Sequence, residues 1–167
     1  VEVYEDVIKN NYQKVLILED DIIINLPAAS TFEKAVDSLP ADWELLYLGF
    51  EGREVPPTGH QIKKAFYHLL RFFKNFPYSH KAISNLYPQR FSDHLYEAGN
   101  HDCTHAYGIT LSAAKKLVKL QQPISYVADH LLAYACTSEI INSYIILPKI
   151  INQQYQVGIS SASYLND

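Results

Sequence analysis

Short apolar runs alternate with amphipathic stretches along the chain, and this pattern predicts strands that alternate with helices. Residues 14–18 and 43–49 are runs of strand-forming side chains, each short enough to be a buried strand. Between them, residues 27–39 begin with a proline and carry apolar side chains at helical spacing. Strand, helix and strand at these lengths are typical of a βαβ unit in a parallel sheet.

The rest of the chain continues this mixture of elements. We predict helices over residues 4–11, 62–76, 113–120 and 129–137. We predict strands over residues 95–98, 104–110 and 140–147. The expected architecture is therefore a single α/β domain over residues 1–167, with a mostly parallel sheet flanked by helices.

Three consecutive carboxylates, Glu19, Asp20 and Asp21, directly follow the first predicted strand, and three isoleucines follow them. Buried acids rarely lack a partner, and ligands of open α/β sheets bind beyond the carboxyl ends of the strands. Side chains alternate along a strand, so Glu19 and Asp21 are expected to share a face while Asp20 points the other way. Two carboxylates on one face suit Mg²⁺ or Mn²⁺. A solvated acidic turn is the alternative interpretation.

Composition places the chain among globular proteins, with 48% hydrophobic and 19% charged residues. Its two cysteines, Cys103 and Cys136, are too few for a disulfide framework. We therefore expect free thiols in a reducing compartment, which indicates a cytoplasmic location. No apolar run approaches the roughly 20 residues of a membrane span.

Charge is distributed unevenly along the chain. No acid lies between Glu54 and Asp93, whereas that segment holds six lysines and arginines. The remainder of the chain therefore carries a formal charge of −10, against −4 overall. An acidic body with one basic insert, residues 61–92, predicts an anionic partner for the insert. The insert lacks a nucleic-acid fold signature, so we expect no nucleic-acid partner.

The predicted helix over residues 62–76 is basic and amphipathic. Its cationic side chains lie mainly off a broad apolar face and are Lys63, Lys64, Arg71 and Lys74. We favour packing of the apolar face against the protein core. The alternative is that the helix faces an anionic acceptor or a membrane surface, which would make the protein peripheral to the inner membrane.

Four segments carry further information through their order. They are KVLILEDD at residues 14–21, WELLYLG at 43–49, HAYGITLSAAKKL at 105–117 and PISYVADHLL at 123–132. The set resembles glycosyltransferase family 25, which includes bacterial lipooligosaccharide galactosyltransferases and collagen galactosyltransferases. The resemblance covers most of the chain outside the basic insert.

This resemblance implies a GT-A-like, Rossmann-like fold. It also implies inverting transfer of a sugar from a donor such as UDP-galactose to a saccharide or glycolipid acceptor, as in lipopolysaccharide biosynthesis. Family members have a preceding stretch with the first strand of the nucleotide-binding sheet. We therefore expect an N-terminally truncated domain whose donor binding and activity depend on that stretch.

Candidate roles follow from the resemblance and from the chemistry of transfer. On the resemblance, Glu19, Asp20 and Asp21 stand at the family's acidic metal and diphosphate motif, with Mn²⁺ or Mg²⁺ as the cation. Transfer also needs a base for the acceptor hydroxyl. Asp129 is the first candidate, because it follows an apolar run at a strand-to-helix junction; a helix cap is its alternative role.

Two further residues complete the candidate site. Glu97 is the second candidate base, with a surface acid as its alternative interpretation. His130 is a candidate third ligand for a cation held by Glu19 and Asp21, or a part of the acceptor site. A histidine beside an aspartate is more often structural.

Three other interpretations stay open. VLILEDD followed by a helix also resembles a response-regulator receiver domain, but the later strand over residues 44–48 ends without the phospho-accepting aspartate of that family. A non-catalytic remnant of the transferase fold is the second. A zinc site is the third: His101, Cys103 and His105 alternate along the chain, although their spacing is not a standard zinc pattern.

Overall fold

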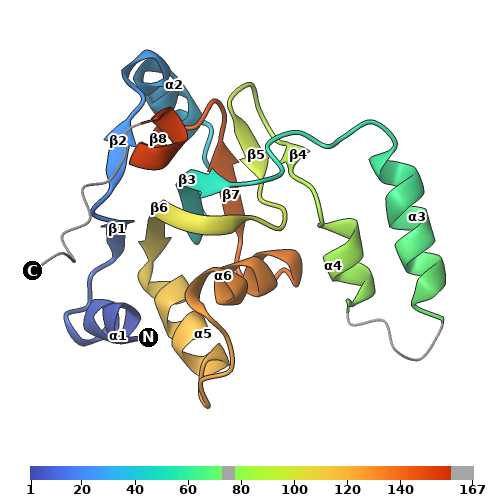
Figure 1. Cartoon of the computed structure of the whole chain (residues 1–167). Helices are drawn as coiled ribbons and strands as arrows, with labels where there is room; N and C mark the ends of the chain where they lie inside the picture. The colour runs from blue at the N-terminus through green and yellow to red at the C-terminus, as the bar shows by residue number, and fades with distance from the viewer. Residues whose placement is uncertain (73–77, 159–167) are drawn as a thin grey trace, which may run out of the picture.

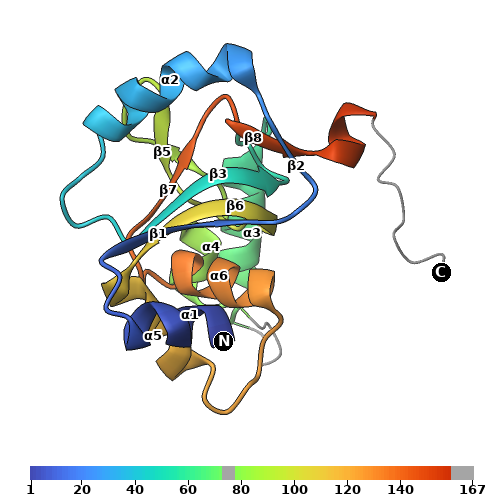
Figure 2. The same ribbon diagram turned by 90° about the vertical axis from the view of Figure 1, so that its left-hand side faces the viewer.

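The apolar runs form the centre of a six-stranded sheet in a computed structural model that describes residues 1–72 and 78–158 (Figures 1 and 2). The strands of this sheet are β1 (Lys14–Leu18), β3 (Leu45–Glu51), β4 (Gln89–Arg90), β5 (Leu95–Glu97), β6 (Asp102–Thr110) and β7 (Ser143–Ile146). A separate two-stranded sheet pairs β2 (Ile22–Ile24) with β8 (Ile151–Gln153). The helices are α1 (Glu2–Lys9), α2 (Leu26–Asp37), α3 (His60–Leu70), α4 (His80–Ser84), α5 (Leu111–Leu120), α6 (Ala128–Thr137) and the 3₁₀ helix η1 (Gln154–Val157).

The sheet order is β1-β6-β3-β7-β5-β4. β1 and β3 run in the same direction, as the predicted βαβ unit requires, but β6 lies between them and is antiparallel to both. β7 is parallel to β3, whereas β5 is antiparallel to β7 and to β4. The α/β class is thus confirmed, but the expected mostly parallel sheet is a mixed one, because strands from later in the chain insert between the early ones.

Both faces of the sheet are covered, which explains why β3 is apolar along most of its length. Alternate β3 residues, Leu45 and Tyr47, face a core formed with α1, α5 and α6. Leu46 and Leu48 face a second core formed with α2. The central strand is therefore fixed from two sides, and its carboxyl end at Glu51 is held in a defined position.

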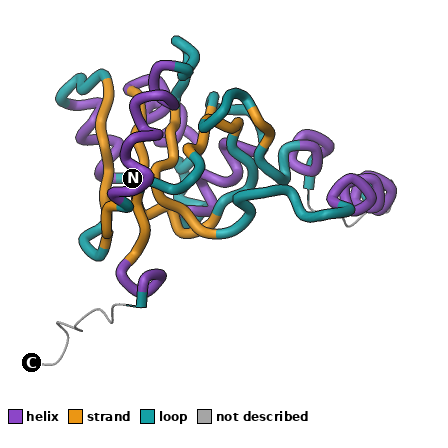
Figure 3. The backbone as a smooth tube through the Cα atoms, turned by 90° about the horizontal axis from the view of Figure 1, so that it is seen from above, coloured by secondary structure: helices purple, strands orange, loops and turns teal. Residues whose placement is uncertain are grey.

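Helix α3 lies outside this body, beyond α4 (Figures 1 and 3). None of its residues from His60 to Leu70 is buried, so the expected packing of its apolar face on the core is wrong. The structural reason is that α3 contacts α4 through its polar side chains. Phe73, Lys74 and Phe76, which the sequence assigns to the same helix, lie outside the described residues.

Candidate functional site

Several acidic residues lie where the carboxyl ends of β1, β3 and β7 meet, and we call this end of the sheet the acidic edge. β1, β3 and β7 run in one direction, so their carboxyl ends meet there. Glu19 follows β1 directly, and Glu51 ends β3. β6 runs the opposite way and begins at this edge, where Asp102 pairs with Glu51. Carboxyl ends of strands are the usual ligand edge of an α/β sheet.

Glu19 and Asp21 share a hydrogen-bond donor, the side-chain amide of Gln153. Its Nε2 donates to Glu19 Oε2 at 2.9 Å and lies 3.3 Å from Asp21 Oδ2. The backbone holds both acids in place, because the Glu19 N–H donates to the His105 carbonyl at 2.9 Å and Gln154 N–H to the Asp21 carbonyl at 2.9 Å. The alternation expected from the sequence therefore brings these two carboxylates to one partner, while Asp20 is exposed.

The charge around Glu19 is negative. The pKa of its carboxyl is raised by partial burial and then by the charges of Asp21, Asp129 and Asp20, although His105 acts in the opposite direction. Asp129 is thus within electrostatic reach of the acidic pair, despite its distance along the sequence. A site that raises the pKa of a carboxyl in this way favours the approach of a cation.

Asp129 lies in the first turn of α6 and faces the start of β6. Its Oδ2 accepts the Cys103 N–H at 3.4 Å. The residue that precedes the helix is Val127, and no side chain caps this helix end. Asp129 therefore does not cap this helix. Its carboxylate is directed towards the edge that holds Glu19.

Cys103 connects the two sides of this edge. Burial raises the pKa of its thiol, as do the charges of Glu51, Asp129 and Asp102. Its backbone φ of 46° is in the left-handed region, which turns the chain as it enters β6. Cys103 therefore lies between the carboxylate that ends β3 and the one on α6.

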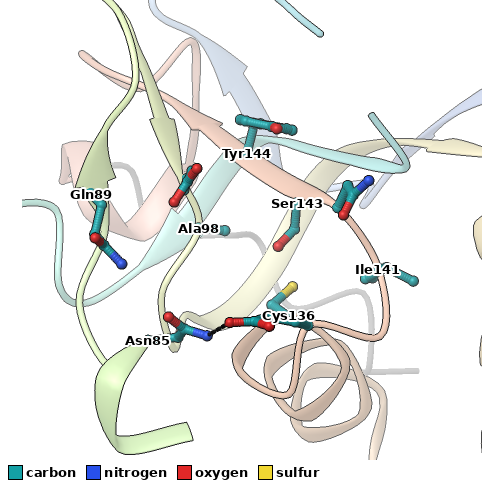
Figure 4. Close-up of a pocket in the computed structure, with 10 residues that line it drawn as sticks. Asn85, Gln89, Ala98, Cys136, Ile141, Ser143 and Tyr144 are labelled. Atoms are coloured by element: carbon teal, nitrogen blue, oxygen red, sulfur yellow. Dashed lines mark hydrogen bonds between the residues drawn. The ribbon is translucent and has the colours of Figure 1, made fainter. Parts of the chain in front are cut away.

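Glu97 lies elsewhere. It is on β5, four strand positions from β1, which corresponds to about 19 Å at the usual spacing of strands. Glu97 is one of the residues that line a separate cavity of about 200 Å³. Figure 4 shows this cavity. The other residues that line it are Asn85, Gln89, Ala98, Cys136, Glu139, Ile141, Asn142, Ser143 and Tyr144. The structure does not bring Glu97 to the acidic pair, and His130 is exposed on α6.

The acidic edge fits a cation that is shared with a ligand rather than enclosed by protein. Among the described residues, no group of three or more His, Cys, Asp or Glu side chains is arranged to hold a metal ion. Mg²⁺ is commonly bound through one or two carboxylates, with phosphate oxygens and water as its other ligands. The two carboxylates brought together on Gln153 match that requirement.

The possible zinc ligands have other contacts. His105 is fully buried, with Nδ1 2.9 Å from the Cys103 carbonyl oxygen and Nε2 3.3 Å from that of Ile151. The ring of His101 packs edge-on against Phe50, with the ring centroids 4.4 Å apart. These histidines therefore support the edge from within the protein.

Sequence reasoning missed two residues of the site. Glu51 ends β3 in the structure but lies two residues beyond the second predicted strand, which stops at residue 49, so the rule that found Glu19 directly after a strand did not reach it. Gln153 gives no comparable signal, because it lies beyond the last predicted strand and an amide is common on any surface.

Gly49 allows the close packing beneath the acids. A Cβ there would lie 2.4 Å from His105 Nε2 and 2.8 Å from the Ile151 carbonyl oxygen, so both His105 and the β8 backbone would have to shift relative to β3. We expect Gly49→Ala to lower the free energy of unfolding by about 1–3 kcal/mol, measured by urea denaturation. Gly108→Ala is the matched control on the adjacent strand, where the nearest atom to the new Cβ is in Trp43 at 3.6 Å. Equal stability of the two variants would contradict the prediction.

Comparison of the sequence with known proteins assigns the chain to a family. The sequence profile of glycosyltransferase family 25 (LPS biosynthesis protein) matches residues 1–132. This stretch includes Glu19, Asp21 and Asp129 and ends before β7 and β8. A search of the curated proteins found no match. The receiver-domain alternative is excluded by the family match, and an antiparallel β6 between β1 and β3 is foreign to the parallel sheet of such domains. The chain belongs to glycosyltransferase family 25 and is a glycosyltransferase of α/β fold.

Proposed function

We propose that the acidic edge of the sheet is the transfer site of a metal-dependent, inverting glycosyltransferase. The donor is a UDP-sugar, with galactose as the sugar, and the acceptor is a saccharide or a lipooligosaccharide. The observation that carries the proposal is the convergence of Glu19, Asp21 and Asp129 on one edge, from segments more than 100 residues apart in sequence. Family membership supports the reaction class.

Glu19 and Asp21 would hold Mn²⁺ or Mg²⁺. When bound, the cation supplies Lewis-acid stabilisation of the negative charge on the leaving diphosphate. The pair fits this role because Gln153 already keeps both carboxylates together, and because partial burial, followed by repulsion from Asp21, raises the pKa of Glu19. Gln153 positions the two acids relative to each other.

Asp129 is the proposed general base. It takes the proton of the acceptor hydroxyl as that oxygen bonds to the anomeric carbon, and the bond to the diphosphate oxygen breaks on the opposite face. A carboxylate in this role must be fixed, and the Cys103 N–H and the first turn of α6 hold Asp129 towards the acids. Orientation of this kind accounts for much of the rate gain in transfer reactions.

Calorimetry with UDP and Mn²⁺ tests the proposal. We expect the chain to bind UDP when Mn²⁺ is present, and binding to be lost in Asp21→Asn and on addition of EDTA. Asp42→Asn is the matched control, because Asp42 lies in the turn before β3, at the opposite end of that strand from Glu51, and its carboxylate accepts a hydrogen bond from the Asn142 side chain. UDP binding that is equally strong without metal, or in Asp21→Asn, would refute the metal site. The same titration on a form extended upstream tests whether residues before Val1 contribute to donor binding.

The non-catalytic interpretation makes a different prediction. A remnant of the fold would show neither Mn²⁺-dependent UDP binding nor UDP release from a UDP-sugar in any form of the protein. The two outcomes are distinguished by measuring UDP release in the presence of a saccharide acceptor.

A further inference from the structure

Helix α3 is turned with its apolar side outward. Ile62, Phe66 and Leu69 recur at the spacing of one helix face, and their exposed fractions are 76%, 53% and 58%. Phe72, just beyond the helix, is 81% exposed. We call these four residues the α3 ridge. Contiguous exposed apolar side chains of this kind mark an interaction site more often than chance exposure does.

The polar side of α3 explains this orientation. Lys64 Nζ donates to the Ser84 carbonyl, and Arg71 Nη1 donates to the Tyr78 carbonyl at 2.7 Å. The imidazoles of His68 and His80 stack, with their Nδ1 atoms 2.9 Å apart. These polar contacts attach α3 to α4 and its flanks, which leaves the apolar side chains of the ridge exposed to solvent.

The charge around the ridge is positive. No acid occurs from residue 55 to 92. The cationic groups on α3 contact neutral partners: Lys64 and Arg71 bond carbonyl oxygens, and Lys63 lies 5.6 Å from the centre of the Tyr67 ring. Their charge is therefore not cancelled by a nearby carboxylate of the insert, and it attracts an anionic surface.

We propose that the α3 ridge docks the protein onto an anionic lipid bilayer. A helix with Phe, Leu and Ile on one side and Lys and Arg on the other lies in the membrane interface, with its apolar side among the acyl chains and its cations near the headgroups. A nucleic acid would meet an apolar surface at the ridge. Among the described residues, no helix is both long and apolar enough to cross a membrane.

The docking surface is separate from the acidic edge. α3 shares no residue with β1, β3 or the other elements that carry the acids of this edge, so docking through α3 uses none of them. Binding to lipid needs neither donor nor metal. Failure of this inference is therefore distinguishable from failure of the proposed function.

Vesicle co-sedimentation tests the inference. We expect the chain to bind vesicles of phosphatidylcholine mixed with phosphatidylglycerol more tightly than vesicles of phosphatidylcholine alone. The double variant Ile62→Ser, Phe66→Ser is expected to lower the partition coefficient about tenfold or more, because it removes two apolar side chains that would be buried among the acyl chains. Lys63→Gln is expected to lower binding to the anionic vesicles roughly fivefold and to leave binding to the neutral ones unchanged.

The matched control is Ile124→Ser. Ile124 and Ile62 are isoleucines with the same exposed fraction, 76%, but Ile124 lies in the loop between α5 and α6. Loss of binding in Ile124→Ser equal to that in the double variant would overturn the inference. So would unchanged binding of the double variant. A lipid-free dimer in sedimentation velocity that the double variant converts to a monomer would also overturn it, because the ridge would then be covered by a second copy.

Discussion

Replacement of Asp129 by asparagine is expected to slow sugar transfer by about 10²–10⁴-fold, the usual contribution of a general base. The amide cannot take a proton at neutral pH, but it keeps the size of the side chain. Its oxygen can still accept the Cys103 N–H, so the first turn of α6 should stay in place. The measurement is the turnover rate with a UDP-sugar and a saccharide acceptor, in the protein that carries this chain.

Two comparisons make the Asp129 result decisive. Urea denaturation should give the same midpoint for wild type and Asp129→Asn, which separates a catalytic loss from unfolding. Glu97→Gln removes the other candidate base, which lies four strand positions away from β1. Full activity in Asp129→Asn, or a comparable loss in Glu97→Gln, would exclude Asp129 as the base.

Acid is expected to weaken the fold through His101. This side chain is fully buried, and burial, followed by the charge of Arg53, lowers its pKa to about 3. Its Nε2 accepts the Gly99 N–H at 3.0 Å, which requires that this nitrogen be unprotonated. An unfolded chain protonates histidine near pH 6.5, so between about pH 6.5 and pH 3 the unfolded state binds the extra proton.

The sign of the effect follows directly. The contribution of His101 to the free energy of unfolding is fully present above about pH 6.5, the pKa of histidine in the unfolded chain. It is lost as the pH falls through this window, by about 2–3 kcal/mol between roughly pH 7 and pH 4.5. Urea denaturation of wild type and His101→Gln at both pH values measures it. The loss on acidification should be smaller in His101→Gln by that amount, whatever the variant's own stability. Equal losses in the two proteins would show that His101 is protonated in the folded state.

Local pattern was enough to predict most elements of the core. The helix predicted over residues 129–137 corresponds to α6, and the run at residues 14–18 is β1. These elements have strong periodicity and clear ends. The two-residue strand β4 and the three-residue strand β8 were not predicted, because so few side chains show no clear period. They form by pairing with β5 and β2.

The order of strands was beyond the sequence pattern for a physical reason. β6 is buried on both faces, so its composition is that of any central strand and does not reveal its direction or its neighbours. For α3 the helical spacing of apolar residues was clear in the sequence, but that spacing does not tell which side of the helix faces the protein. The contacts of Lys64 and His68 with α4, and of Arg71 with Tyr78 just before it, decided that.

The site residues that the sequence predicted are those to which a local rule applied. Glu19 and Asp21 were found because acids follow an apolar strand, and Asp129 because it begins a helix after an apolar run. Their proximity depends on β6 and α6 meeting the end of β1, which is a property of the assembled sheet.

The amide that joins the two acids comes from 134 residues further along the chain than Glu19. It lies past residue 132, where similarity to the family profile stops. A protein shortened after that point would still be recognised as a relative and would still contain Glu19, Asp21 and Asp129. It would nevertheless lose the Gln153 side chain, whose amide holds Glu19 beside Asp21, so a shortened version of this protein must keep β8 to keep this arrangement.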